Sequence, residues 1–201
     1  MRNFINFQKK LFGIKLPSIS FDIDGVLKKG NNPIPRAKEA IIKIKERGIP
    51  LSLVTNGGGE LEGIRGNKIS HILKLEDQFK FKAHEVFLCH TPMKDLLSKF
   101  KDKLILISGI HNSSEVIENY GFTKYMTVHE YYTIFQEIAP LFSFLHTKEE
   151  RKSIIKNVEK RLESSLSHDN IPPVHALFML TDVVNWEINA QVRVSFIEGF
   201  F

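Results

Sequence analysis

Residues 18–27 read SISFDIDGVL, and residues 50–59 read PLSLVTNGGG. In the first stretch, apolar residues alternate with serine and aspartate, which predicts a strand whose end carries two carboxylates, Asp22 and Asp24. Gly25 then allows the backbone to turn away. The second stretch predicts another apolar strand, which ends at Thr55. Polar groups that follow neighbouring parallel strands meet at one edge of a sheet, where open α/β sheets bind their ligands.

The rest of the chain continues this alternation of strand and helix. Apolar runs predict further strands at 85–90, 103–108 and 175–180, with a shorter one at 124–128. Amphipathic or capped stretches predict helices at 35–48, 60–75, 92–100, 113–121, 129–138 and 147–165. Such an order predicts an α/β protein with a Rossmann-like parallel sheet.

Composition excludes several protein classes. The chain has 201 residues, of which 42% are apolar and 25% charged, which is typical of a globular protein. Its single cysteine excludes a disulfide scaffold or a cysteine-rich zinc module. No apolar run is long enough for a membrane span. The net charge of +5 is spread along the chain, so we expect no nucleic acid partner.

The N-terminal segment 1–16 is basic, and the chain has no acidic residue before Asp22. Phenylalanine, isoleucine and leucine interleave with its cations, a pattern typical of a mitochondrial presequence. The alternative is a frayed basic terminus on a cytoplasmic protein.

The two strand ends carry groups suited to phosphate chemistry. An aspartate can attack a phosphoryl group, a second carboxylate can act as general acid, and Mg²⁺ would screen the negative charges. Beside them, Thr55 and Asn56 offer hydrogen-bond donors. Gly57, Gly58 and Gly59 are expected to open the following helix and to present backbone N–H groups to phosphate. The alternative is that these glycines form an ordinary loop.

The motifs FDIDGVL (21–27) and LVTNGGG (53–59) together resemble the haloacid dehalogenase-like hydrolases, in particular capped members of the class IIA type. The stretches LCHTPMKDL (88–96), NYGFTKYMTV (119–128) and FMLTDVVNWEINAQ (178–191) resemble the subfamily named after the cat eye syndrome critical region. This resemblance implies an α/β core and an inserted α/β cap, placed here at residues 17–90 and 91–201.

The resemblance also implies roles for individual residues. Asp22 would be the nucleophile and a metal ligand, and Asp24 the general acid and base, with its main-chain carbonyl as a second metal ligand. Thr55, Asn56 and Gly57 would bind the phosphoryl group, and the cofactor would be Mg²⁺. The substrate would be a small phosphorylated metabolite, with glycerophospholipid-related esters as one option, and a homo-oligomer is compatible with the pattern.

Two residues of the predicted helix 60–75, Glu62 and Arg65, lie at subfamily positions and are expected to form a structural (i, i+3) salt bridge.

Two family features are missing from this match. The later lysine is not identifiable, and the chain contains no Gly-Asp pair to complete the metal site. Thr181 and Asp182 follow an apolar strand, but the resemblance assigns them to the cap. We therefore expect a chain that ends inside the cap, either from a truncated gene or as a short isoform. The resemblance implies a Mg²⁺-dependent phosphomonoester hydrolase that forms an aspartyl-phosphate and is inactive as this chain. The alternative is a non-catalytic binding or regulatory module.

Overall fold

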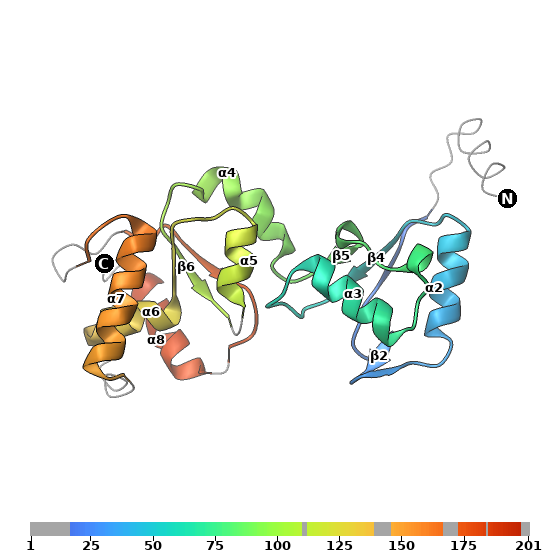
Figure 1. Cartoon of the computed structure of the whole chain (residues 1–201), viewed down its shortest axis with the longest axis horizontal. Helices are drawn as coiled ribbons and strands as arrows, with labels where there is room; N and C mark the ends of the chain where they lie inside the picture. The colour runs from blue at the N-terminus through green and yellow to red at the C-terminus, as the bar shows by residue number, and fades with distance from the viewer. Residues whose placement is uncertain (1–16, 110–111, 139–145, 167–172, 184, 198–201) are drawn as a thin grey trace. The chain divides into compact units, whose positions relative to one another are not determined.

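The computed structural model describes residues 17–109, 112–138, 146–166, 173–183 and 185–197. It divides the chain into two compact units, with the division after Thr91 (Figure 1). Each unit contains its own three-stranded parallel sheet. The α/β class and the parallel sheets predicted from the sequence are confirmed. The basic N-terminal segment 1–16 lies outside the described residues.

The first unit has a sheet in the order β1-β4-β5, with β1 at one edge. The strands are β1 (Ile19–Phe21), β4 (Leu51–Val54) and β5 (Val86–Phe87). A small antiparallel hairpin, β2 (Lys28–Lys29) and β3 (Asn32–Pro33), follows β1. The helices are α2 (Ala37–Glu46) and α3 (Glu62–Ile72), with single 3-10 turns η1 (Asp77–Phe79) and η2 (Ala83–Glu85) before β5.

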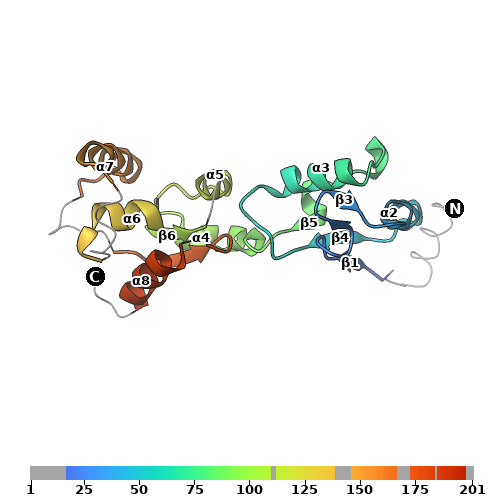
Figure 2. The same cartoon turned by 90° about the horizontal axis from the view of Figure 1, so that it is seen from below.

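Helices α2 and α3 both contribute to one core on one face of the sheet. Leu51 and Leu53 of β4 are buried in that core with apolar residues of α2 and α3, and Figure 2 shows α3 lying along one side of the strands. Two right-handed crossovers that move in the same direction across a sheet place their helices in this way. The opposite face carries exposed side chains, since Val54 and Phe87 are 48% and 45% exposed.

The second unit has a sheet in the order β7-β6-β8. Its strands are β6 (Ile105–Ser108), β7 (Tyr125–Thr127) and β8 (Ala176–Met179). The helices are α4 (Leu97–Phe100), α5 (Ser113–Asn119), α6 (Val128–Ile134), α7 (Lys148–Leu162) and α8 (Trp186–Ile197), with 3-10 segments η3 (Thr91–Leu96) and η4 (Gln136–Ile138). All four residues of β6 are buried, which explains why this strand is a continuous apolar run without alternation.

Several elements differ from the sequence-based prediction. The glycines 57–59 do not open a helix, because α3 begins only at Glu62 and Gly59 has a φ of 76°. Residues 92–100 were predicted as a helix, but the segment is 3-10 up to Leu96 and becomes an α-helix only afterwards. The strand at 85–90 shrinks to two residues, and α8 was not predicted.

Two glycines inside α3 make a matched test of how this helix packs. A Cβ at Gly66 would lie 3.1 Å from the carbonyl oxygen of Phe81, whereas at Gly63 the nearest atom would be 3.7 Å away. We expect Gly63→Ala to raise the free energy of unfolding by up to about 1 kcal/mol, since alanine favours helix. Gly66→Ala should lower it by about 1 kcal/mol or more, because overpacking outweighs that gain. Equal shifts in urea denaturation would contradict the close approach of α3 to Phe81.

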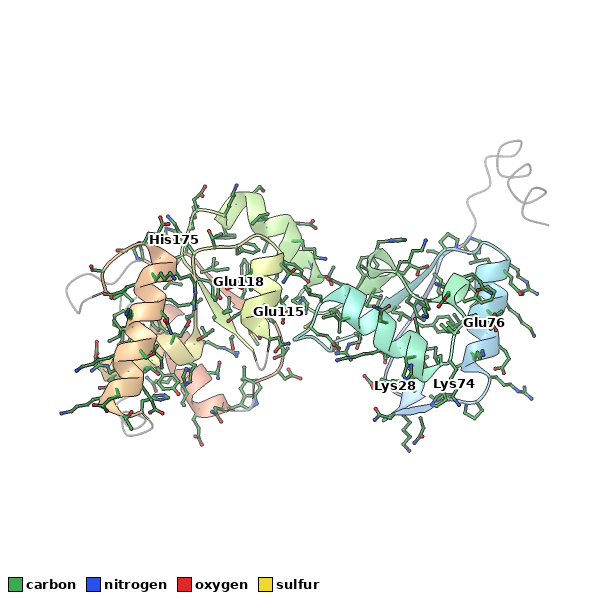
Figure 3. All side chains as sticks on the ribbon, in the orientation of Figure 1. Lys28, Lys74, Glu76, Glu115, Glu118 and His175 are labelled. Carbon is green, nitrogen blue, oxygen red and sulfur yellow. The ribbon has the colours of Figure 1, made fainter. Side chains whose placement is uncertain are left out.

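A partly buried ion pair ties α6 to α7 in the second unit. Arg161 donates to both carboxylate oxygens of Glu130 at 2.8 and 2.9 Å, and its guanidinium lies 4.2 Å from the ring centroid of Tyr125. The Tyr125 hydroxyl in turn donates to Glu118 of α5, labelled in Figure 3, at 2.6 Å. Burial is the main reason that the pKa of Tyr125 rises to about 12. Burial also acts to raise the pKa of Glu130, but hydrogen bonds from Arg161 and Thr127 outweigh it and lower that pKa.

This pair predicts a pH-dependent stability. A lowered pKa in the folded state stabilises the fold fully above the ordinary glutamate value, and that contribution is lost as the pH falls through the folded pKa. We expect Glu130→Gln to cost about 1–3 kcal/mol at neutral pH and progressively less in acid, measured by urea denaturation across the pH range. Glu149→Gln, at an exposed position of α7, should show no such trend. A cost for Glu130→Gln that does not change with pH would contradict the pairing.

Candidate functional site

The end of β1 presents both aspartates on the exposed side of the chain. Ile23 between them is fully buried, so alternation directs Asp22 and Asp24 away from the core. Gly25 has a φ of 84°, a left-handed conformation that side chains disfavour. The chain then turns back into the β2–β3 hairpin. Buried Ile23 and the turn at Gly25 together fix the direction of both carboxylates.

The parallel register of β1 on β4 brings three of the predicted site residues together. Phe21 pairs with Leu53, so Asp22 and Thr55 follow at the carboxyl ends of adjacent strands. Asp22, Thr55 and Asn56 line one open pocket of about 310 Å³. No hydrogen bond or ion pair engages the exposed Asp22 carboxylate within the described residues.

The loop after β4 is ordered by a short side-chain contact. The N–H of Gly57 donates to the Thr55 hydroxyl oxygen at 3.1 Å, and the N–H of Thr55 donates to the carbonyl of Phe87 at 3.0 Å. Thr55 is buried, whereas Asn56 is exposed. The Thr55 oxygen accepts from Gly57, so its hydroxyl proton is left to donate elsewhere. The Gly57 N–H, predicted as a phosphate donor, is already used inside the loop.

Asp24 lies apart from that pocket. Its carboxylate forms an ion pair with the ammonium group of Lys28, on the hairpin strand β2 (Figure 3). Neither Asp24 nor Gly57 lines the pocket that contains Asp22. Within the described residues only Oδ1 of Asp24 is engaged, and its side chain is 60% exposed, so the carboxylate stays accessible from solvent.

The donor chemistry at the strand end suits a hard divalent cation, since carboxylate and carbonyl oxygens are its preferred ligands. Asp22 and the main-chain carbonyl of Asp24 are the groups that would hold it. Among the described residues, no three histidine, cysteine, aspartate or glutamate side chains come together as a metal site. The described part of the chain thus offers a partial ligand set.

A charged cluster behind the loop was not predicted. Glu60 forms ion pairs with two cations, Arg65 (Nε to Oε1, 2.7 Å) and Lys68 (Nζ to Oε2, 2.5 Å). The predicted salt bridge between Glu62 and Arg65 is wrong, because Glu62 is buried and accepts a hydrogen bond from Thr91 at 2.8 Å.

The signal for this cluster was present in the sequence. Arg65 and Lys68 are three residues apart and so share a helix face, and Glu60 precedes that helix.

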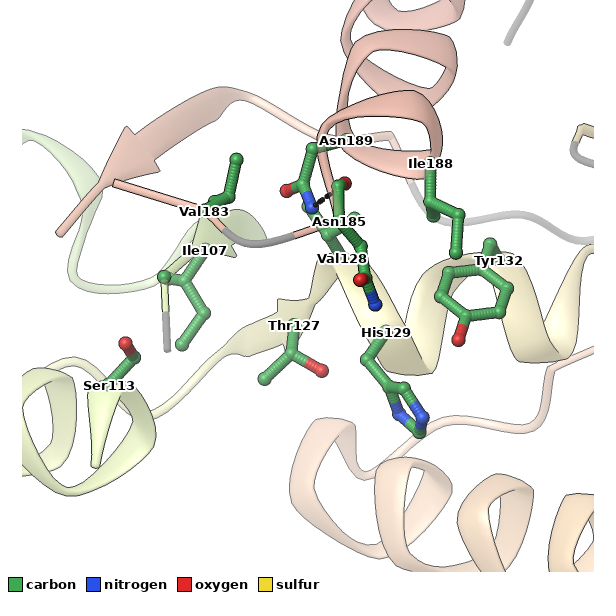
Figure 4. Close-up of a pocket in the computed structure, with 11 residues that line it drawn as sticks. Ile107, Ser113, Thr127, Val128, His129, Tyr132, Val183, Asn185, Ile188 and Asn189 are labelled. Atoms are coloured by element: carbon green, nitrogen blue, oxygen red, sulfur yellow. Dashed lines mark hydrogen bonds between the residues drawn. The ribbon is translucent and has the colours of Figure 1, made fainter. Parts of the chain in front are cut away.

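The second unit has a separate small cavity of about 150 Å³ at the carboxyl ends of its strands (Figure 4). Thr127, His129 and Asn185 are among its polar lining groups. Burial, followed by the effect of nearby His146, lowers the pKa of His129. None of the lining residues is an aspartate, glutamate, lysine or arginine. No pattern in the sequence predicted this cavity.

Comparison with known proteins decides the family. A family model described as haloacid dehalogenase-like hydrolase matches residues 19–123, which is more than half of the chain. The chain belongs to the haloacid dehalogenase-like hydrolases. The matched range covers β1, β4 and the loop between β4 and α3, where the predicted site lies.

Two curated relatives share this sequence pattern. A mitochondrial hydrolase of Saccharomyces cerevisiae is 34% identical over 123 residues, which cover 61% of this chain and 33% of the relative. A cardiolipin synthase (CMP-forming)/mitochondrial hydrolase fusion protein of Schizosaccharomyces pombe is 28% identical over 177 residues, covering 86% of this chain and 27% of the relative. The chain thus spans about a third or less of the curated relatives it matches.

A solved structure supports the fold assignment. A possible sugar phosphatase of the same superfamily from Cytophaga hutchinsonii matches with a TM-score of 0.57 and 19% identity, over 94% of this chain and 53% of that one. Within the described ranges, none of the helices is both long and apolar enough to cross a bilayer.

The Thr55–Gly57 contact predicts a matched pair of substitutions. Thr55→Val keeps the shape but removes the acceptor for the Gly57 N–H, and should lower the free energy of unfolding by about 1 kcal/mol. Thr55→Ser keeps the hydroxyl and should retain the hydrogen bond and its contribution. Urea denaturation of both variants measures this difference. If valine proves as stable as serine at this position, the hydroxyl does not order the loop.

Proposed function

We propose that this haloacid dehalogenase-like hydrolase binds small phosphate esters at the β1–β4 strand ends and transfers their phosphoryl group to Asp22. The observation that supports this most is the meeting of the Asp22 carboxylate, which has no partner among the described residues, with Thr55 and Asn56 in one pocket. A carboxylate oxygen attacks phosphorus, the bond from phosphorus to the ester oxygen breaks, and an aspartyl-phosphate results. Water then attacks that phosphorus and releases phosphate, which regenerates Asp22.

The neighbouring residues have distinct parts in this proposal. The Thr55 hydroxyl and the Asn56 amide donate hydrogen bonds to phosphoryl oxygens, whose charge would otherwise repel Asp22. Asp24 gives a proton to the departing ester oxygen and takes one from the attacking water. Mg²⁺, held by Asp22 and the Asp24 carbonyl, supplies electrostatic screening when bound.

The substrate class and location are also proposals. The name of the fission yeast relative joins a cardiolipin synthase to a mitochondrial hydrolase, which favours phosphate esters related to glycerophospholipids. The names of both curated relatives include "mitochondrial hydrolase". Together with the basic segment 1–16, this favours a mitochondrial location for the chain.

The proposal predicts which residue becomes phosphorylated. Residues 1–201 are incubated with Mg²⁺ and acetyl phosphate, whose good leaving group needs no protonation, and the peptides are then analysed by mass spectrometry. We expect a phosphoryl group on Asp22, none on the Asp22→Asn variant, and unchanged labelling in Asp77→Asn, a surface control in the same unit. No label on Asp22 would contradict the proposal and favour a non-catalytic binding or regulatory module.

Turnover of two substrates with different leaving groups tests the role of Asp24 as proton donor. With an alkyl phosphate ester, Asp24→Asn should slow phosphate release by about 10²–10⁴-fold, because the leaving oxygen then lacks its proton donor. With p-nitrophenyl phosphate, whose leaving group needs little protonation, the first release of p-nitrophenol should be nearly unchanged, whereas phosphate release should stay slow because hydrolysis of the aspartyl-phosphate still needs Asp24 as base. Since the described residues form a partial metal site, we expect slow turnover at most from residues 1–201. Rapid multiple turnover would contradict this expectation.

A further inference from the structure

Arg65 places a guanidinium group directly behind the loop that follows β4. A Cβ at Gly57 would lie 3.4 Å from Nη2 of Arg65 and 3.5 Å from the Thr55 hydroxyl oxygen. These two atoms therefore flank the same point above Gly57 and are less than about 7 Å apart. Hydrogen bonds of about 2.9 Å from two donors so placed reach different oxygens of one tetrahedral anion. A glycine at position 57 leaves that point open.

The Arg65 guanidinium is oriented by an ion pair, but its two Nη groups remain available to a ligand. Its Nε is buried and forms an ion pair with Glu60, although without the geometry of a hydrogen bond. Within the described residues, no hydrogen bond is made by Nη1 or Nη2 of Arg65. Glu60 is shared with Lys68, so the Glu60–Arg65–Lys68 cluster carries a net positive charge. Glu60 thus holds the guanidinium in place while its Nη donors stay available.

The chemistry of arginine and the position of Arg65 favour a role in anion binding over a purely structural ion pair. A guanidinium stays charged at all physiological pH values, and its planar fork can bind two oxygens of a phosphate. The residues 55–59 carry no charge. Arg65 is a cation that approaches this loop at Gly57, although it does not itself line the pocket of Asp22. The Arg65 side chain is 18% exposed, whereas the Lys68 side chain on the same carboxylate is 61% exposed. Partial burial strengthens its interaction with an anion.

We infer that Arg65 is a phosphate-binding residue, whose Nη groups bind an oxygen of the phosphoryl group alongside the Thr55 hydroxyl. This inference rests on the proposed function, because it places the anion at the same loop. It assigns the positive charge of the site to the helix that follows the glycines. Lys68, its partner on Glu60, has no part in binding.

The experiment measures binding of inorganic phosphate to residues 1–201 by isothermal titration calorimetry. Arg65→Met should weaken binding by about 10- to 100-fold, the usual effect of losing a hydrogen bond to a charged group. Arg65→Lys, which keeps the charge without the fork, should lose less. The matched control Lys68→Met removes the other cation on Glu60 and should leave the affinity nearly unchanged. Equal affinities for Arg65→Met and Lys68→Met would overturn the inference.

A second measurement uses the wild-type chain, so it remains informative even if the Arg65 variants do not fold. Phenylglyoxal modifies accessible arginines, and peptide mass spectrometry reports each site separately. Phosphate should protect Arg65 while leaving the exposed Arg36 and Arg47 reactive, and equal protection or none would overturn the inference. If Thr55→Val abolishes phosphate binding and Arg65→Met does not, only the role of Arg65 fails. If the wild-type chain binds no phosphate, the proposed function fails with it.

Discussion

The parallel register of β1 on β4 is the constraint on which the site depends. With Phe21 opposite Leu53, the residues just beyond each strand end, Asp22 and Thr55, must meet at one edge of the sheet. A shift of one residue would exchange the two faces of β1 and bury the aspartates in place of Ile23. Burial of Ile23 therefore fixes the register and, through it, the chemistry. The same pairing of β1 with β4 therefore places Ile23 in the core and Asp22 in the site.

The loop after β4 shows how this strand pairing extends to ligand binding. Thr55 continues the sheet by its hydrogen bond to Phe87, and its side chain closes the turn onto Gly57. The first turn of α3 then returns Arg65 to the same glycine. Because Gly57 has no side chain, the Thr55 hydroxyl at the end of β4 and the Arg65 guanidinium of α3 can both lie close to it. Polar groups from a strand end and the following helix, ten residues apart in the sequence, are thereby gathered at one glycine.

The sequence predicts the parts of the fold in which pattern and burial agree. Alternation in β1 reflects a sheet with one covered face, and the unbroken apolar run of β6 reflects burial on both faces, so both strands are recognisable. The strand-end residues of the site follow from the same reasoning. Helix α8 was missed because its apolar residues do not gather on one side. The start of α3 was misplaced because the cost of glycine in a helix was given too little weight.

The pairing of charged groups was harder to predict than the strands. Helical spacing alone favours Glu62 with Arg65, but the buried Glu62 is held by Thr91, from a segment far along the chain. Arg65 then reaches back to Glu60. Whether a cation pairs with a given carboxylate depends on the other groups that bind this carboxylate, and those groups are brought there by tertiary contacts. The ion pair of Asp24 with Lys28 likewise depends on the hairpin turn after β1.

The strand ends and the adjoining loop are proposed to form an anion site next to Asp22. The most direct test is a crystal structure of residues 1–201 with tungstate, a phosphate mimic that anomalous scattering locates without ambiguity. We expect one strong peak within hydrogen-bond distance of the Thr55 hydroxyl, beside the Asp22 carboxylate. A crystal in which tungstate occupies other sites and leaves the Thr55–Gly57 loop empty would contradict it.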